Sequence, residues 1–207
     1  MKSVKRHIQQ NNSGINHGSG GFTLIEVLMC IAIMSIVFGT LYQTFNTFNR
    51  AYTTENVVAG VQQKTRNGVE FMVHDIRLAG LDPLGTSGAG FLVAGPTGLQ
   101  FTADTNFDGD VADPFENITY ALNGSLLEQT NHLGAETLMD NVTALTFSFL
   151  DGDDNELIDG TLSPPQVPAG HLADIKTVVI SLSTQKPAGR DEPVSRTYTT
   201  RVRCRNQ

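Results

Sequence analysis

The sequence predicts an α+β fold, in which a long N-terminal α-helix packs on an antiparallel β-sheet domain. No proline occurs between Phe22 and Leu81, and apolar residues recur at helical spacing in the second half of that stretch. After Pro83, short runs of alternating apolar residues are separated by glycine, proline and asparagine, as in strands joined by turns. The 207 residues suffice for one domain plus an N-terminal segment.

The expected helix covers residues 22–80 and changes character along its length. Its first half, from Phe22 to Tyr42, is almost wholly apolar and approaches the ~20 residues that span a bilayer. Its second half is polar with one apolar stripe, which we expect to face the sheet. Gly80 and Pro83 mark the expected end. The stripe consists of Val58, Val61, Thr65, Val69, Met72, Ile76 and Ala79.

The expected β domain covers residues 81–207. Asn123-Gly124 stands between two apolar runs and predicts a type I′ hairpin turn. Loops are expected at 151–171 and, between the last two strands, at 185–195. Alternation places one set of side chains in the core and a row of arginines in solvent. The core set includes Leu145, Phe147, Phe149, Val178, Ile180, Leu182 and Val202, and the arginines are Arg201, Arg203 and Arg205.

The net charge of the chain limits the kinds of partner that we expect it to bind. The formal net charge is -7, and removal of a leader containing Lys2, Lys5 and Arg6 would take it to -10. Nucleic acid is not an expected partner, because phosphate binding needs clustered cations. An acidic surface does suit hard cations such as calcium. Cys30 lies in the apolar run and Cys204 lies near the end, so we expect no disulfide between them.

The apolar segment contains one carboxylate, Glu26, that needs an explanation. A cleaved secretory signal has its small-residue cleavage site after the apolar run, whereas Ser19, Gly20 and Gly21 precede it. A plain transmembrane anchor leaves Glu26 unexplained, because an acidic side chain in hydrocarbon is unfavourable and normally has a partner. A third explanation accounts for both features.

The stretch "GFTLIEVLMCIAIMS" (21–35) closely resembles the N-terminal motif of type IV prepilins and type II secretion pseudopilins. The resemblance implies a pilin-like fold and cleavage by a prepilin peptidase, on the cytoplasmic side, after Gly21. Phe22 would become the methylated N-terminus, and Glu26 would be the fifth residue of the mature chain. The leader would be residues 1–21, whose cations favour the cytoplasmic side.

In a filament of such subunits, Glu26 would have a specific task. It would lie about one helical turn from the Phe22 amine. The glutamate of one subunit would neutralise the amine of a neighbour, and a buried polar pair of this kind fixes the register of packed helices. The implied partners are other pilin or pseudopilin subunits, the prepilin peptidase and the bacterial inner membrane. The globular domain would lie in the periplasm before assembly into a pilus at the cell surface.

Two shorter stretches, "HDIRLAGLDPLG" (74–85) and "VRCRN" (202–206), resemble PilW-type minor pilins. They imply a structural subunit of a type IV pilus. A J-type minor pseudopilin of type II secretion shares the helix motif and stays open as an alternative. A filament-tip adhesin is a further alternative, although aromatic residues are 7% of the chain and tryptophan is absent. We expect no enzyme, because the sequence has no HExxH, Walker loop or CxxC motif.

One loop has the composition of a calcium site. The run "DTNFDGD" matches the first half of an EF-hand loop, with alternating oxygen ligands before a glycine. The match then stops, because Phe115 occupies the twelfth position, and Asp113 or Glu116 would have to substitute. A solvated turn is the alternative, since aspartate, asparagine and glycine favour turns anyway. The candidate ligands are Asp104, Asn106, Asp108, Asp110 and Asp113; "DGDDNEL" (151–157) is a weaker copy.

Overall fold

The computed structural model describes residues 21–188 and 191–206 of the chain. The expected leader, 1–21, lies outside the described residues except for Gly21. The chain divides into two compact units, Met1–Phe48 and Asn49–Gln207. Helix α1 (Leu24–Ile76) contributes its first part to one unit and its second part to the other.

The helix is confirmed, but it ends at Ile76, and turns occupy residues 77–80. Gly80, at φ 76°, donates its backbone N–H to Thr102 O at 3.0 Å rather than continuing the helix. Within the second unit, the predicted stripe is buried from Val61 onward, and Val58 is half-buried. The helical spacing of apolar residues therefore identified the packed face correctly.

A five-stranded antiparallel sheet forms from consecutive hairpins. Neighbouring strands in sequence are neighbours in space, in the order β1-β2-β3-β4-β5. The predicted hairpin at Asn123-Gly124 forms, but its turn type was wrong. The two loop residues are Gly124 and Ser125, and only Gly124 has a positive φ, of 62°, which fits a type II′ turn. The strands are β1 (Phe91–Gly95), β2 (Gly98–Thr102), β3 (Asn117–Asn123), β4 (Leu126–Asn131) and β5 (Gly134–Met139).

A second, three-stranded antiparallel sheet contains β6 (Val142–Leu150), β7 (Thr177–Ala188) and β8 (Asp191–Arg203). The expected loop at 185–195 was wrong, because β7 and β8 continue through most of it. The register shifts between Lys186 and Ala188, so Pro187 sits at a bulge, where a missing N–H is tolerated. Between β6 and β7, the region expected as a loop contains two isolated bridges and a short 3₁₀ helix, η1 (Ala169–Asp174).

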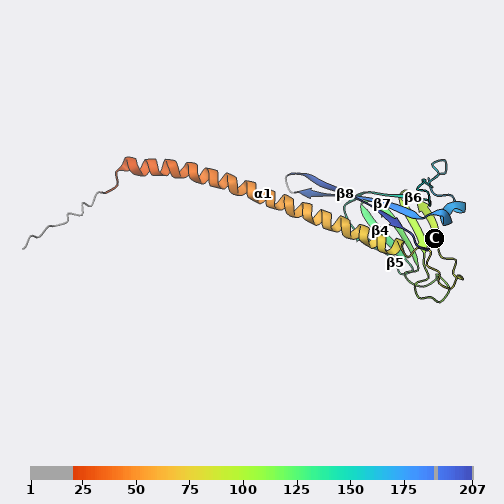
Figure 1. Ribbon diagram of the computed structural model, residues 1–207. Helices are drawn as coiled ribbons and strands as arrows, with labels where there is room; N and C mark the ends of the chain where they lie inside the picture. Colours follow the sequence, from red (N-terminus) through yellow and green to blue (C-terminus); the bar gives the residue numbers. More distant parts are fainter. Residues whose placement is uncertain (1–20, 189–190, 207) are drawn as a thin grey trace, which may run out of the picture. The chain divides into compact units, whose positions relative to one another are not determined.

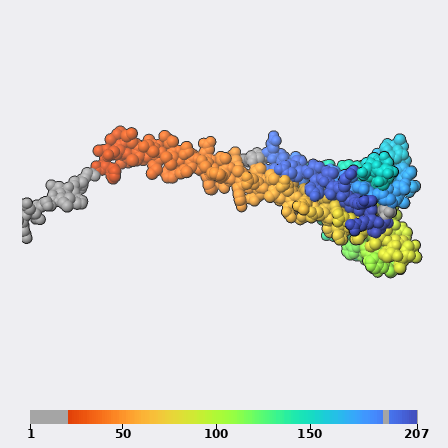
Figure 2. Space-filling view, viewed as in Figure 1, coloured from red at the N-terminus to blue at the C-terminus, as the bar shows by residue number. Residues whose placement is uncertain are grey.

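The core of the second unit lies where the helix and both sheets meet. Figures 1 and 2 show the later part of α1, in yellow, alongside the blue strands β7 and β8. The sheets also meet each other, since the rings of Phe91 and Phe149 pack edge-to-face with centroids 6.3 Å apart. The result is an α+β, pilin-like architecture with antiparallel sheets. The fully buried side chains of the core include Met72, Ile76, Phe101, Tyr120, Phe147, Ile180 and Val202.

Candidate functional site

The first turn of α1 is a capping box formed by Thr23 and Glu26. The Thr23 hydroxyl accepts a hydrogen bond from the Glu26 backbone N–H at 3.3 Å. In return, a Glu26 carboxylate oxygen accepts from the Thr23 N–H at 2.8 Å and from the Thr23 hydroxyl at 2.9 Å. Both residues thus satisfy donors that a helix start leaves unpaired. The T-x-x-E spacing carried this signal, which our reading of the sequence missed.

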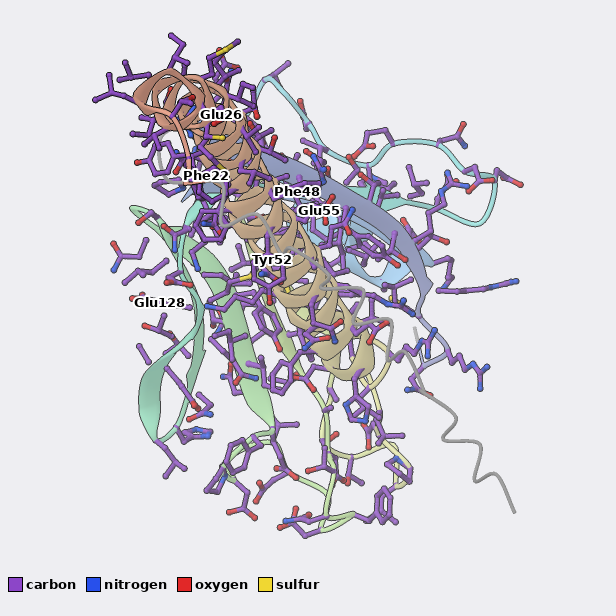
Figure 3. The ribbon with its side chains drawn as sticks, turned by 90° about the vertical axis from the view of Figure 1, so that its left-hand side faces the viewer. Phe22, Glu26, Phe48, Tyr52, Glu55 and Glu128 are labelled. Atoms are coloured by element: carbon purple, nitrogen blue, oxygen red, sulfur yellow. The ribbon has the colours of Figure 1, made fainter. Side chains whose placement is uncertain are left out.

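Gly21 and Phe22 lie just before the helix and are both exposed, Phe22 to 88%. No other described residue of the chain buries either of them. Figure 3 labels Phe22 and Glu26 at the beginning of the helix. The carboxylate of Glu26 is held by its own helix here, and the N-terminal amine with which it is expected to pair does not exist until Gly21 is removed.

A largely apolar, exposed helix surface follows Glu26. Helix α1 is long and apolar enough to cross a membrane, and that apolar window is wholly exposed within the chain. The 25 residues from Leu24 to Phe48 would extend about 37 Å, more than the ~30 Å of a hydrocarbon core. Cys30, on this surface, and Cys204, buried in the other unit, are both free thiols. The exposed large side chains include Ile25, Leu28, Ile31, Met34, Val37, Phe38, Leu41, Phe45 and Phe48.

The acidic loop between β2 and β3 folds around two buried carboxylates. Asp104 is fully buried and accepts hydrogen bonds from the backbone N–H groups of Phe107, at 2.6 Å, and Gly109, at 3.0 Å. Gly109 has a φ of 92°, and a Cβ there would lie 2.7 Å from Thr86 Oγ1, so only glycine fits. Asp104 therefore organises the turn from within.

Glu116 is the second buried carboxylate, exposed to only 1%. Its Oε1 accepts from the Thr105 N–H at 2.9 Å, the Thr105 hydroxyl at 3.2 Å and the Asn106 N–H at 3.2 Å. Its Oε2 is buried and has no hydrogen-bond partner. A buried carboxylate oxygen without a partner is unfavourable, because it has lost its water without replacement.

Three acidic side chains of this loop converge. Ligand atoms of Asp108, Asp110 and Glu116 lie within 4.8 Å of one another. Asp113 is tied to the group through the Asn106 amide, whose Nδ2 donates to Asp108 Oδ2 at 3.0 Å and to Asp113 Oδ2 at 2.7 Å. Desolvation, and the negative charges of Asp108, Glu116 and Asp110, raise the pKa of Asp113.

The structure thus brings together two of the five predicted ligands, Asp108 and Asp110, with Glu116, which the sequence offered as an alternative to Asp113. Phe115, at the twelfth position of the incomplete EF-hand pattern, is 54% exposed with a φ of 70°, and the carboxylate follows one residue later. In the weaker copy, Asp151 accepts from the Asp153 and Asn155 backbone N–H groups and from the Asn155 amide. No group of three converging ligands forms there among the described residues.

A cluster of hydrogen-bonded polar side chains links the end of α1 to the five-stranded sheet. The Tyr120 hydroxyl donates to Asp75 Oδ2 at 2.6 Å, and Gln129 Nε2 donates to the same oxygen at 2.9 Å. Burial of Tyr120, together with the Asp75 charge, raises the pKa of the phenol. Every member of the cluster has a partner, so we assign it a structural role.

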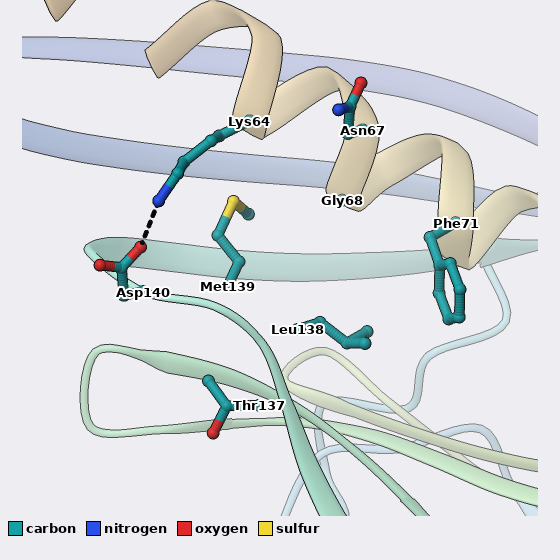
Figure 4. A pocket seen from close by; sticks show the side chains of 8 residues that line it. All are labelled: Lys64, Asn67, Gly68, Phe71, Thr137, Leu138, Met139 and Asp140. Carbon is teal, nitrogen blue, oxygen red and sulfur yellow. Dashed lines mark hydrogen bonds and ion pairs between the residues drawn. The ribbon is translucent and has the colours of Figure 1, made fainter. Parts of the chain in front are cut away.

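A groove of about 480 Å³ runs between α1 and the strand β5, with Phe71 and Leu138 among its walls (Figure 4). The Lys64 ammonium and the Asp140 carboxylate form an ion pair across it at 3.2 Å. A Cβ at Gly68 would lie 2.9 Å from Met139 Cε, so a larger residue there would require the flexible end of Met139 to shift.

One comparison with known proteins bears on the N-terminal segment. Residues 16–42 match the family described as the prokaryotic N-terminal methylation motif. The match includes Gly21, Phe22 and Glu26. A search of curated proteins finds no match to the chain. The motif and the apolar helix support a type IV pilin-like or pseudopilin-like subunit, which is structural and suited to inner-membrane anchoring followed by assembly with similar subunits.

Proposed function

We propose that the chain is a minor pilin of a type IV pilus, of the PilW type, processed between Gly21 and Phe22. The methylation motif at residues 16–42, followed by an exposed apolar helix surface, is the observation that carries the proposal. The stretches 74–85 and 202–206, which resemble PilW-type minor pilins, favour the pilus over a secretion pseudopilus. The globular unit would lie in the periplasm until assembly.

The mechanism we propose is transfer of the helix from lipid to the filament core. In the membrane, the side chains between Leu24 and Phe48 would be covered by lipid tails, and in the filament by the helices of neighbouring subunits. Both environments are apolar, so the move exposes little apolar surface to water. The paired charges of Glu26 and a neighbouring Phe22 amine would then select one register, because other registers leave each charge buried alone.

Mass spectrometry of the N-terminal peptide of the purified membrane-bound protein tests processing. We expect a chain beginning at Phe22 with a methylated amine, and the uncleaved chain in cells that lack the prepilin peptidase. A Gly21→Leu variant should remain uncleaved, because a larger side chain replaces the residue at the cut. An intact N-terminus in wild-type cells, or a start after residue 40, would contradict the proposal.

Isolation of the assembled filaments distinguishes the pilus from the secretion alternative. The chain should appear in sheared type IV pili at low stoichiometry and should be absent from purified type II secretion complexes. Recovery with the secretion complex alone would leave the processing result intact and would assign the subunit to a pseudopilus instead.

A further inference from the structure

We propose that the loop between β2 and β3 binds one calcium ion through Asp108, Asp110 and Glu116, with the unpartnered Glu116 oxygen as its buried ligand. The proposal does not depend on which filament the chain joins. The loop is among the yellow-green segments in Figure 1.

The buried Oε2 of Glu116 has no hydrogen-bond partner, and this observation points to a ligand. Three donors converge on Oε1 and hold the carboxyl group in one orientation, while Oε2 has no partner. A carboxylate oxygen that is buried and oriented, with no hydrogen-bond donor on it, is suited to bind a cation.

The neighbouring side chains supply the remaining charge. Asp108, Asp110 and Glu116 each offer one oxygen, and these three oxygens lie within 4.8 Å of one another, a separation that one ion with oxygen ligands at ~2.3–2.6 Å bridges. No ion pair among the described residues involves any of the three carboxylates. Hydrogen bonds from the Asn106 amide and the Asp110 N–H to Asp108, and from the Ala112 N–H to Asp110, offset part of their mutual repulsion. A divalent cation would convert the remaining repulsion into attraction.

Calcium fits this donor set better than magnesium or zinc. All three ligands are carboxylates, and no histidine or cysteine belongs to the group, which disfavours zinc. Two of the ligands come from an exposed, irregular turn, and the third is the buried turn residue just before β3. Calcium accepts such irregular geometry with six to eight oxygens, whereas magnesium requires a near-ideal octahedron.

Thermal unfolding of the full chain in detergent, with calcium or with a chelator, tests the site. An ion that binds only the folded state raises Tm. For an affinity typical of extracellular calcium modules, ~10 mM calcium should raise Tm by about 3–10 °C. Isothermal titration with calcium alone should give one site per chain. No Tm rise and no binding heat would overturn the proposal.

Matched variants distinguish calcium binding at this site from general screening of the acidic surface by calcium. Glu116→Gln should abolish the calcium-dependent rise and should leave Tm in chelator equal to or above that of wild type, because it removes a buried charge. Asp110→Asn, on the exposed side of the turn, should weaken binding at least tenfold. Asp153→Asn, an exposed aspartate of the other acidic loop, should respond to calcium like wild type.

Three results would contradict the assignment. One is an undiminished calcium response in Glu116→Gln. Another is an equal loss of response in Asp153→Asn, which would indicate screening of the acidic surface. The third is an equal Tm rise with magnesium or with sodium chloride of matched ionic strength, which would exclude calcium as the specific ligand.

Discussion

The Glu26 carboxylate has two separate roles, one in its own chain and one in the proposed filament. Within the chain it caps its own helix through Thr23. In the proposed filament it neutralises the Phe22 amine of a neighbour. The first task needs only an acceptor oxygen, whereas the second needs a negative charge. Glutamine supplies the acceptor without the charge, so substitution can tell the two tasks apart.

We therefore expect Glu26→Gln to retain the helix start and to lose filament incorporation by tenfold or more, and we expect a similar loss of incorporation for Glu26→Ala. Thr23→Ala should lose the cap, worth about 0.5–2 kcal/mol of helix stability, and should keep most incorporation. The measurement is immunoblotting of sheared filaments, with the amount of each variant in the membrane as control. Normal assembly of Glu26→Gln together with failure of Thr23→Ala would mean that capping, not charge pairing, matters.

In the acidic cluster of the loop between β2 and β3, the buried carboxylate belongs to Glu116 and lies one residue after Phe115. The loop composition predicted an acidic cluster, and two of the predicted ligands do converge. The buried member is Glu116, which the sequence offered only as a substitute, because an EF-hand spacing puts its last carboxylate at position 115. Which neighbour points inward depends on where β3 begins, and the positive φ of Phe115 sets that.

At the scale of elements, the contact between α1 and β7 contains one buried hydroxyl pair. Thr65 Oγ1 and Thr184 Oγ1 lie 2.7 Å apart, and both residues are buried. Thr65 has a single hydroxyl hydrogen, which it donates to Val61 O at 2.7 Å. Thr184 must therefore be the donor to Thr65, and the two substitutions should not be equivalent.

Thr65→Val leaves the Thr184 donor buried without a partner and should lower the free energy of unfolding by about 1–3 kcal/mol. Thr184→Val removes only an additional donor to Thr65 and should lower it by about 0.5–1.5 kcal/mol. The double variant should lose less than the sum, because no orphaned donor remains. Urea denaturation of the full chain in detergent measures all three. Equal single effects that simply add would contradict the assigned direction of the bond.

The hairpin of β7 and β8 shows why one expected loop was wrong. Pro187, Gly189 and Pro193 are turn-forming residues, and they predicted a loop at 185–195. The strands nevertheless pair from Thr177↔Arg203 out to Ala188↔Asp191. The cross-strand hydroxyl pairs Ser181–Thr199, at 3.0 Å, and Ser183–Thr197, at 2.7 Å, support this pairing on the exposed face. The prolines are accommodated at a bulge near its end.

At the scale of the whole molecule, the division into two units predicts that the second unit, Asn49–Gln207, is stable without the first. Among the residues that the structure describes, every buried core side chain comes from Val61 or later, whereas the large apolar side chains of residues 22–48 are exposed. A fragment of residues 49–207 should therefore be soluble, monomeric and cooperatively folded, with a Tm within a few degrees of that of the full chain in detergent. Circular dichroism melting and sedimentation test this. An unfolded or aggregated fragment would show that the apolar segment contributes to the globular core.

The sequence by itself determined the long helix, its buried stripe, the antiparallel strands and the methylation motif, because these follow from periodicity and from a local residue pattern. Tertiary structure alone decided the rest. It divided the strands into two sheets where Asn141, with a φ of 61°, turns the chain. It also buried one oxygen of Glu116 beside Asp108 and Asp110. Such convergence depends on packing between distant segments, which no local pattern records.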